Sequence, residues 1–323
     1  MMRRESTSRW PLRSPADPGV GNGAYALCMC CLWCPLLFAG GCYYRASQIQ
    51  LPADAATGDT VIDAQSPCST DPRPDGGHWI ATEVQGINSI TDAGTGAEDD
   101  PSCTCDRNTI VFASTRNGSA SALFIAQRGH DGSFTVSELT EPNSVASDKG
   151  SPEISRDGAT LYFTAGDTNM RRVYVSHLEP SSGTWTTSVV ASTSLGFPED
   201  VAISPDGQTA VVANGGRLYL ETGGPDFAFT NSHEIQITPP NDSIPNRAAP
   251  SVMDDAKVVY FHDGPFNARK IYRLVDGTPS ALEVTELNAE GMRNSAPFVL
   301  EGERYMLFAR DGRIYEATYQ PSP

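Results

Sequence analysis

The sequence predicts an all-β protein, a β-propeller of five four-stranded blades closed by an N-terminal outer strand. A segment such as residues 152–163 occurs five times along the chain. Its turn positions lie 51, 49, 49 and 47 residues apart, at Asp106, Asp157, Asp206, Asp255 and Gly302. Repeats of about 40 to 50 residues are typical of propellers. Six blades are the alternative count.

The first two strands of each blade are predicted from a turn between two short apolar runs. In residues 152–163 the turn is Asp157-Gly158, which tolerates the positive backbone angles of a tight hairpin. The run Leu161-Tyr162-Phe163 then pairs antiparallel with the first strand. Copies one and five depart from the pattern, with Asp106-Arg107 and Gly302-Glu303 at the turn.

The third and fourth strands follow in each copy. An aromatic residue marks the third strand, at Phe124, Tyr174, Tyr219, Tyr272 and Tyr315. More polar outer strands are expected over residues 133–139, 184–190 and 282–287. The last copy ends after its third strand, while residues 77–84 precede the first copy and begin with a similar Gly-x-aromatic pattern. We therefore expect residues 77–84 to complete the fifth blade, which removes open sheet edges.

These repeats are similar to a known family. The passages Asp99-Asp100-Pro101, residues 110–118, residues 151–163 and Ile203-Ser-Pro-Asp-Gly207 resemble the WD40-like PD40 repeats of TolB-type propellers. The resemblance covers about residues 77 to 319 and implies the fold. TolB itself has six blades and a separate α/β domain, so a role in the Tol complex is not implied.

The N-terminus predicts export. Arginines between Arg3 and Arg13 precede an apolar stretch, residues 24–41, which is typical of a secretory signal over residues 1–41. Phe38-Ala39-Gly40-Gly41-Cys42 resembles a bacterial lipobox, which implies lipidation of Cys42. Tyr43 after the cysteine favours the outer membrane, by resemblance to sorting in enteric bacteria. An uncleaved membrane anchor is the alternative, although Pro35 interrupts the stretch.

The cysteines favour a disulfide over a metal site. Cys28, Cys30, Cys31 and Cys34 lie inside the apolar stretch and would leave with the signal, so no metal site is expected. An oxidising compartment permits one disulfide, joining Cys68 to Cys103 or Cys105. A buried Cys103 thiol is the alternative, because Cys103 aligns with Ile154 and Ile203.

Composition divides the rest of the chain and limits its partners. Residues 42–76 are rich in Pro, Ala, Asp, Ser and Thr, which predicts a flexible tether, and residues 77–323 form the propeller. The chain has 39 acidic and 23 basic residues and a net charge of −16. This negative charge disfavours binding to nucleic acid and to anionic lipid, so we expect contact with the membrane only through the attached lipid. We also expect a monomer.

Catalytic motifs are missing from the sequence. It contains no Gly-x-Ser-x-Gly, His-Glu-x-x-His or Gly-x-x-x-x-Gly-Lys pattern, and we expect no cofactor. The five histidines, His262 among them, are scattered and are interpreted as surface or satisfied polar residues. One enzymatic alternative is a five-bladed glycoside hydrolase that uses carboxylates at the channel. Its candidates are Glu153, Glu199 and Asp200.

Loop lengths point to a binding face. The loops between second and third strands (residues 115–122, 166–172 and 263–270) and the linkers between blades are long and share one face, here the long-loop face. The opposite, short-turn face has the tight turns. Scaffolds commonly bind partners through such loops. The candidate binding residues on the long-loop face are Arg116, Asn117, Arg171, Arg172, Asn246, Arg247, Phe266, Asn267, Arg269 and Arg293. We therefore expect a non-catalytic envelope lipoprotein, facing the periplasm or exterior, that docks a protein or glycan.

Overall fold

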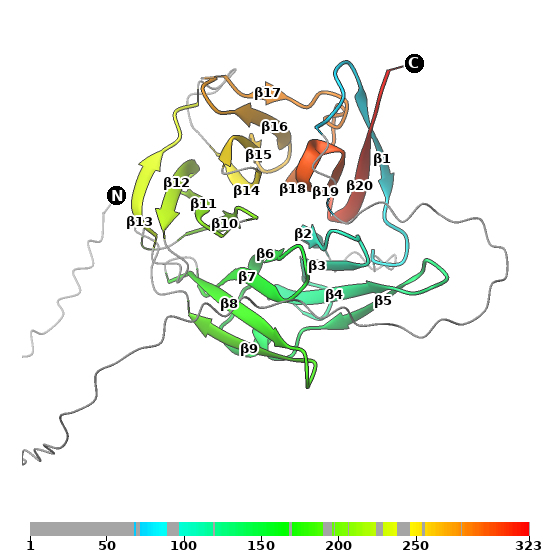
Figure 1. Ribbon diagram of the computed structural model, residues 1–323, viewed down its shortest axis with the longest axis vertical. Coiled ribbons are helices and arrows are strands. Elements are labelled where there is room, and N and C mark those ends of the chain that lie inside the picture. Colours follow the sequence, from blue (N-terminus) through cyan, green and yellow to red (C-terminus); the bar gives the residue numbers. More distant parts are fainter. Residues whose placement is uncertain are drawn as a thin grey trace, which may run out of the picture. The chain divides into compact units, whose positions relative to one another are not determined.

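The protein is a propeller of five four-stranded antiparallel sheets (Figure 1). The computed structural model describes residues 68, 72–88, 97–118, 120–167, 170–189, 196, 198–205, 207–223, 229–237, 246–253, 256–278 and 280–322. The expected signal (residues 1–41), Cys42 and most of the expected tether lie outside the described residues. The five-blade prediction is confirmed, and the six-blade alternative is not.

The strands of each blade follow one another from the channel outwards. Blade 1 contains β2 (Glu98–Cys103), β3 (Thr109–Ser114), β4 (Ala122–Arg128) and β5 (Phe134–Glu138). Blade 2 contains β6 (Gly150–Ile154), β7 (Thr160–Ala165), β8 (Arg172–Glu179) and β9 (Thr184–Val189). Blade 3 contains β10 (Asp200–Ile203), β11 (Thr209–Asn214), β12 (Arg217–Gly223) and β13 (Phe229–Glu234). Blade 4 contains β14 (Ala248–Met253), β15 (Val258–Asp263), β16 (Lys270–Val275) and β17 (Leu282–Glu283).

Blade 5 closes the ring as predicted. It contains β18 (Asn294–Val299), β19 (Tyr305–Arg310), β20 (Arg313–Gln320) and the N-terminal β1 (His78–Glu83). Strand β1 pairs antiparallel with β20, and Trp79 lies opposite Tyr319 with ring centroids 5.3 Å apart. The first and last strands of the described chain therefore lie side by side in one sheet (Figure 1). Two short 3-10 helices, η1 (Pro142–Ser144) and η3 (Glu301–Glu303), lie in a blade linker and a turn. None of the helices in the described ranges has the length and apolar character needed to span a bilayer.

Buried second strands and stacked rings hold each blade together. A phenylalanine of the second strand stacks on the aromatic residue of the third, with ring centroids 5.4 to 5.8 Å apart, in the pairs Phe112–Phe124, Phe163–Tyr174, Phe261–Tyr272 and Phe308–Tyr315. Offset-stacked rings contribute beyond their buried area. Blade 3 has the smaller Val212 at this position, opposite Tyr219. The repeated aromatic signature is therefore the core of the blade.

Three turns depart from Asp-Gly, and two of them hold contacts between blades; the third is Asp255-Ala256. Arg107 and Glu303 occupy the place of Gly158 and share its left-handed conformation, with φ of 58°, 54° and 77°. Arg107 stacks on Tyr305 of the preceding blade, 4.8 Å from the ring centroid. Glu303 likewise reaches back to blade 4, where its carboxylate accepts from Arg273 and Tyr260 at 2.5 to 2.7 Å. These contacts offset the backbone strain of about 1–2 kcal/mol that a residue with a side chain incurs there.

An asparagine in the linker fixes the start of the third strand in three blades. Asn88, Asn143 and Asn288 each accept from the N–H of the third strand's first core residue at 2.8 to 2.9 Å. These core residues are Ile314, Leu123 and Ile271. Each amide also donates to the same residue's carbonyl. The linker is thereby tied to the sheet, and the long-loop face is held in place.

Candidate functional site

The channel entrance is built from a repeated strained bulge. The innermost strands β2, β6, β14 and β18 each break register near their N-termini. The residue before proline has φ between 45° and 50° in each, at Asp100, Ser151, Ala249 and Ala296. Non-glycine residues rarely adopt this conformation. It persists only where the surrounding structure holds the backbone in place, which is common at functional sites. Strand β10 has Val201 in place of proline and keeps a regular register.

Side chains bind the N–H groups that these bulges leave outside the strand ladders. Four such bonds, of 2.9 to 3.2 Å, surround the entrance. In each, a backbone N–H donates to a side chain: Ser151 to Asp100, Ala249 to Asp200, Ala296 to His262 and Asp100 to Asp99. Ser151 also donates its hydroxyl to Asp200 at 2.5 Å. All but the Asp99 bond join neighbouring blades, so the carboxylates at the entrance connect the blades of the ring.

A second belt of bonds lies deeper in the channel. The N–H groups of Ile154, Ile203 and Val299 donate to Ser102, Glu153 and Ser251 of the preceding blades at 2.7 to 3.1 Å. Glu153 therefore occupies the place of the two serines and accepts the same kind of bond. The Glu199 side chain is exposed, and its carbonyl accepts from Thr164. The three hydrolase candidates are thus dispersed between two belts and the surface.

The cavity on the channel axis is small. Residues from the inner strands of all five blades line it, including Asp100, Ser151, Val201, Ala249 and Phe298, and its volume is about 30 Å³. This is room for about one or two water molecules. Arg156 of blade 2 reaches across the short-turn end and lies 4.7 Å from the Phe298 ring centroid in blade 5. A sugar ring does not fit between these side chains as they stand.

Charge repulsion marks Asp100. Burial raises the pKa of its carboxyl well above the usual range, and the negative charges of Asp99 and Asp200 raise it further. Burial also raises the pKa of Asp99, although a bond from Ser295 partly offsets this. Asp100 is therefore favoured in its neutral form while it still accepts from Ser151. Nothing in the sequence marks Asp99 or Asp100 as a site of charge repulsion, because only the folded ring brings Asp200 close.

Asp100→Asn is expected to make the protein more resistant to alkaline pH. A carboxyl with a raised folded pKa stabilises the fold below its unfolded pKa, and that stability is lost as pH rises through the folded value. Asparagine keeps the acceptor for Ser151 without the titration. From pH 5 to pH 8, the free energy of unfolding measured with urea should fall less for the variant than for the wild type.

Asp200→Ala is the matched comparison for Asp100→Asn. It removes the acceptor of two donors, Ser151 and Ala249, so it should lower the free energy of unfolding by about 1–3 kcal/mol. A variant Asp100→Asn that is less stable than wild type at pH 8 would contradict the assignment of a neutral Asp100.

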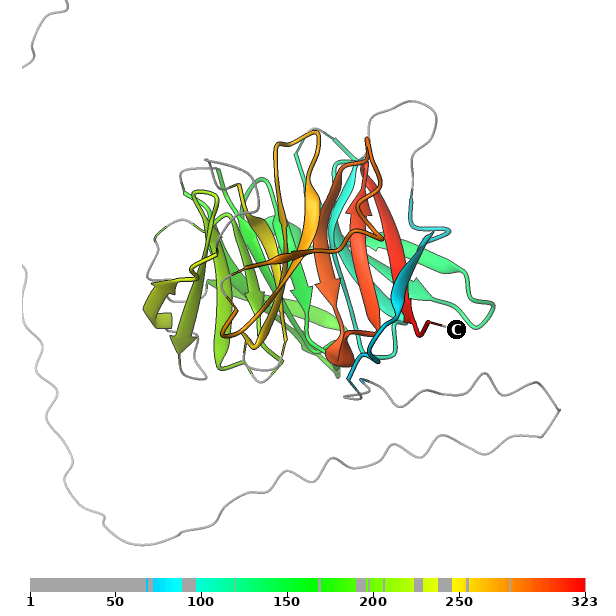
Figure 2. The ribbon, with the colours of Figure 1, turned by 90° about the horizontal axis from the view of Figure 1, so that it is seen from above.

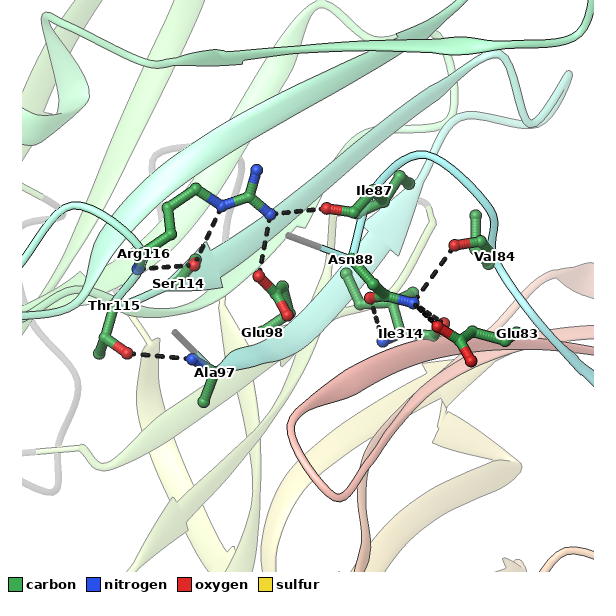
Figure 3. Close-up of polar contacts among 10 residues, drawn as sticks. All are labelled: Glu83, Val84, Ile87, Asn88, Ala97, Glu98, Ser114, Thr115, Arg116 and Ile314. Atoms are coloured by element: carbon green, nitrogen blue, oxygen red, sulfur yellow. Dashed lines mark hydrogen bonds and ion pairs between the residues drawn. The ribbon is translucent and has the colours of Figure 1, made fainter. Parts of the chain in front are cut away.

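Half of the predicted binding residues are bound within the protein. Arg116 pairs with Glu98, Asn117 with Glu138, Arg171 with Asp148, Asn246 with the Gly264 carbonyl and Arg247 with Asp263. The Arg116 guanidinium lies over the Phe112 and Phe124 rings. Figure 3 shows that it also donates to the Ile87 carbonyl. Because Arg116 pairs with the fully buried Glu98 of blade 1 and also bonds to Ile87, it joins blade 1 to the segment that follows β1. These five residues do not form one patch.

The other five remain available on the long-loop face. Arg172 and Asn267 are exposed, and the Arg172 guanidinium has no polar partner among the described residues. Phe266 is 65% exposed. The guanidinium carbons of Arg269 and Arg293 lie 5.0 and 4.6 Å from its ring centroid. The structure therefore brings together Phe266, Arg269 and Arg293, here called the arginine cluster, at the side of the channel entrance formed by blades 4 and 5.

Buried His262 belongs to the same neighbourhood. It is 3% exposed, and its Nδ1 accepts from the Ala296 N–H at 3.2 Å. Burial lowers its pKa well below the usual value, and the charges of Arg269 and Arg293 lower it further. The interpretation of His262 as a surface or satisfied residue is wrong, since Nε2 is buried without a partner in the described part of the chain. One feature of the sequence indicates that His262 is buried: it directly follows Phe261 at the end of an apolar strand.

The cysteines resolve the open pairing. Cys68 is bonded to Cys105, with Cα atoms 4.8 Å apart, and Cys103 remains a buried thiol. Among the described residues, no group of three His, Cys, Asp or Glu side chains is placed to hold a metal ion.

Comparison with known proteins gives no family and only distant similarity to solved structures. No family model matches the sequence, and no curated protein matches it. Among solved structures, the chain is similar to TolB from Acinetobacter baumannii, with 16% identity over 68% of this chain and a TM-score of 0.42. That alignment spans 54% of the TolB chain. It is also similar to a family 117 glycoside hydrolase from Zobellia galactanivorans (11% identity, 76% and 90% coverage, TM-score 0.48). A GH43 endo-arabinanase from Bacillus licheniformis gives 15% identity, 74% and 95% coverage and a TM-score of 0.48.

Proposed function

We propose that this protein is a non-catalytic binding module of the cell envelope that docks a protein or glycan on its long-loop face. The observation that supports this most is the arginine cluster, in which an exposed aromatic ring carries two guanidinium groups. Aromatic and arginine side chains are enriched among the residues that dominate binding energies. After release of residues 1–41, a lipid on Cys42 would hold the module at the membrane. The outer membrane is the proposed location.

The way the chain enters the propeller favours an accessible long-loop face. Cys105 lies in the turn between β2 and β3, so the disulfide fixes Cys68 at the short-turn face. The next described segment stays on this face, where Arg304 donates to the Pro72 carbonyl at 3.2 Å and Arg73 stacks on Tyr319. In the side view, the C-terminus and η3 lie on this same side (Figure 2). A tether leaving from the short-turn face would point the long-loop face away from the membrane.

The hydrolase alternative has weaker support. Glu153 and Asp200 each accept backbone N–H groups of a neighbouring blade at 2.7 and 2.9 Å, which accounts for their position without catalysis. Glu153 lines the cavity of about 30 Å³ at the entrance and a second pocket of about 120 Å³ between blades 2 and 3, whereas Asp200 lines neither. Hydrolysis of an envelope or plant polysaccharide that is lost in Glu153→Gln or Asp200→Asn would establish the enzyme instead.

Crosslinking pull-down from envelopes with the full, tethered chain tests the docking face. Phe266→Glu and Arg172→Glu change exposed side chains of the long-loop face. We expect each variant to lower partner capture at least fivefold, because each places a carboxylate on the proposed contact surface. Arg128→Glu is the control, since Arg128 is exposed at the short-turn end of β4. Capture that both long-loop variants leave unchanged would contradict the proposal.

A further inference from the structure

Unlike other arginines of this acidic protein, Arg269 and Arg293 have no carboxylate within ion-pair distance of their guanidinium groups in the part of the chain that the structure describes. Arg116, Arg217, Arg247, Arg273 and Arg313 each lie within 3.3 Å of a glutamate or aspartate oxygen. Neither the Arg269 nor the Arg293 guanidinium has a hydrogen-bond or ion-pair partner within the described ranges, and the Nε of each is buried. A buried N–H group without an acceptor costs about 1–3 kcal/mol. An acceptor supplied from outside would recover this free energy.

Phe266 and the backbone hold the two guanidinium groups in place before any ligand binds. Both guanidinium carbons lie within 5.0 Å of the same ring centroid. The Asn294 N–H donates to the Arg269 carbonyl at 3.0 Å, and the Arg293 N–H donates to Asp311 at 3.1 Å. Two like charges over one ring repel each other, and an anion would relieve this repulsion. Side chains that are already ordered lose less entropy on binding.

His262 adds a third donor. Because its Nδ1 accepts the Ala296 N–H, the neutral ring carries its proton on Nε2. That nitrogen is buried and has no acceptor among the residues that the structure describes. The positive charges of Arg269 and Arg293 both act on this ring, so the three donors share one neighbourhood.

The surroundings select the kind of anion. Asp99 lies near both arginines, with Asp100 beside it, and a doubly charged phosphate would be repelled more than a singly charged group. The planar guanidinium fork matches a carboxylate. Exposed Met292, next to Arg293, and Phe266 add apolar surface that suits the side chains of a peptide.

We propose that Arg269, Arg293 and His262 form a binding site for a carboxylate of an acidic peptide segment in the docked partner. This inference rests on the proposed function and adds the chemistry of the ligand. The guanidinium groups would hold the carboxylate, the His262 Nε2–H would donate to it, and Phe266 would contact the adjoining peptide.

Calorimetric titration with poly-L-glutamate of about 20 residues tests the site directly. The wild type should bind, and Arg269→Lys/Arg293→Lys should raise Kd at least tenfold, because lysine keeps the charge but loses the planar fork. The matched control is Arg128→Lys, an arginine that also stacks on a phenylalanine, 4.5 Å from the Phe134 centroid, on the opposite face. Its Kd should stay within twofold of wild type. The His262 Nε2 resonance should shift on titration of the wild type.

Three results would overturn the inference. These are no binding by the wild type, equal binding by the lysine double variant, and binding of an oligogalacturonate that depends on the two arginines while polyglutamate binding does not. Circular dichroism of each variant shows whether it is folded. The proposed function is tested separately: envelope capture that needs Phe266 but survives the lysine double variant would reject the carboxylate site and retain docking. Polyglutamate binding without any face-dependent capture would reject docking instead.

Discussion

Trp79→Ala should lower the free energy of unfolding by about 3–5 kcal/mol, the range for removing a large buried aromatic side chain. Trp79 is 4% exposed, lies against Tyr319 and packs in the core between blades 4 and 5. It belongs to β1, the one strand that comes from the far end of the chain to complete its blade. Loss of Trp79 therefore weakens the closure of the whole ring. Urea unfolding followed by far-UV circular dichroism measures the change.

The neighbouring Ile80 supplies the control for Trp79. Its side chain is 48% exposed on the same strand, so Ile80→Ala should change the free energy of unfolding by less than about 1 kcal/mol. Trp79→Phe keeps an aromatic ring and should fold if the alanine variant does not. Similar losses in Trp79→Ala and Ile80→Ala would show that β1 is dispensable for closure.

Arg116→Met should cost about 3–5 kcal/mol of stability, because it removes the arginine that pairs with the buried Glu98 carboxylate. The Glu98 side chain is fully buried, and the Arg116 side chain is 13% exposed. The bond to the Ile87 carbonyl, 2.8 Å long, is lost as well (Figure 3). The double variant Glu98→Gln/Arg116→Met should recover much of the loss, since no unpaired charge remains. Thermal and urea unfolding of wild type, Arg116→Met, Glu98→Gln and the double variant form the double-mutant cycle.

An exposed pair provides the comparison for Arg116. Arg217 and Glu234 are 2.8 Å apart with side chains 49% and 30% exposed, so Arg217→Met should cost under about 1 kcal/mol. Arg116→Met that costs no more than Arg217→Met would reject the structural role. Arg116 would then again be a candidate for binding a partner.

Much of the fold follows from residues close together in the sequence. Asp157-Gly158 and the runs around it predict the hairpin of β6 and β7, and Tyr174 predicts β8. The Gly-x-aromatic pattern of residues 77–84 also predicted β1, because outer strands share similar local requirements. The linker asparagine of blade 4 is Asn288, while Asn294 lies buried in β18 and accepts from Arg310 at 2.8 Å.

The candidate site was predicted less well. Arg116 and Arg269 look equivalent in the sequence, since both lie in loops after second strands, but one faces Glu98 and the other Phe266. Which partner an arginine meets depends on how distant segments meet in the ring, and spacing along the chain does not encode that.

The sequence by itself determined the repeat, the number of blades and the strand that closes them, because turns, alternation and aromatic pairs act over a few residues. Only the tertiary structure decided which charges are neutralised. It gathers Asp99, Asp100 and Asp200 at one entrance and leaves Arg269, Arg293 and His262 with N–H groups that have no acceptor among the described residues. Burial and charge act through space, so the chemistry of this face arises only when five distant segments surround one axis.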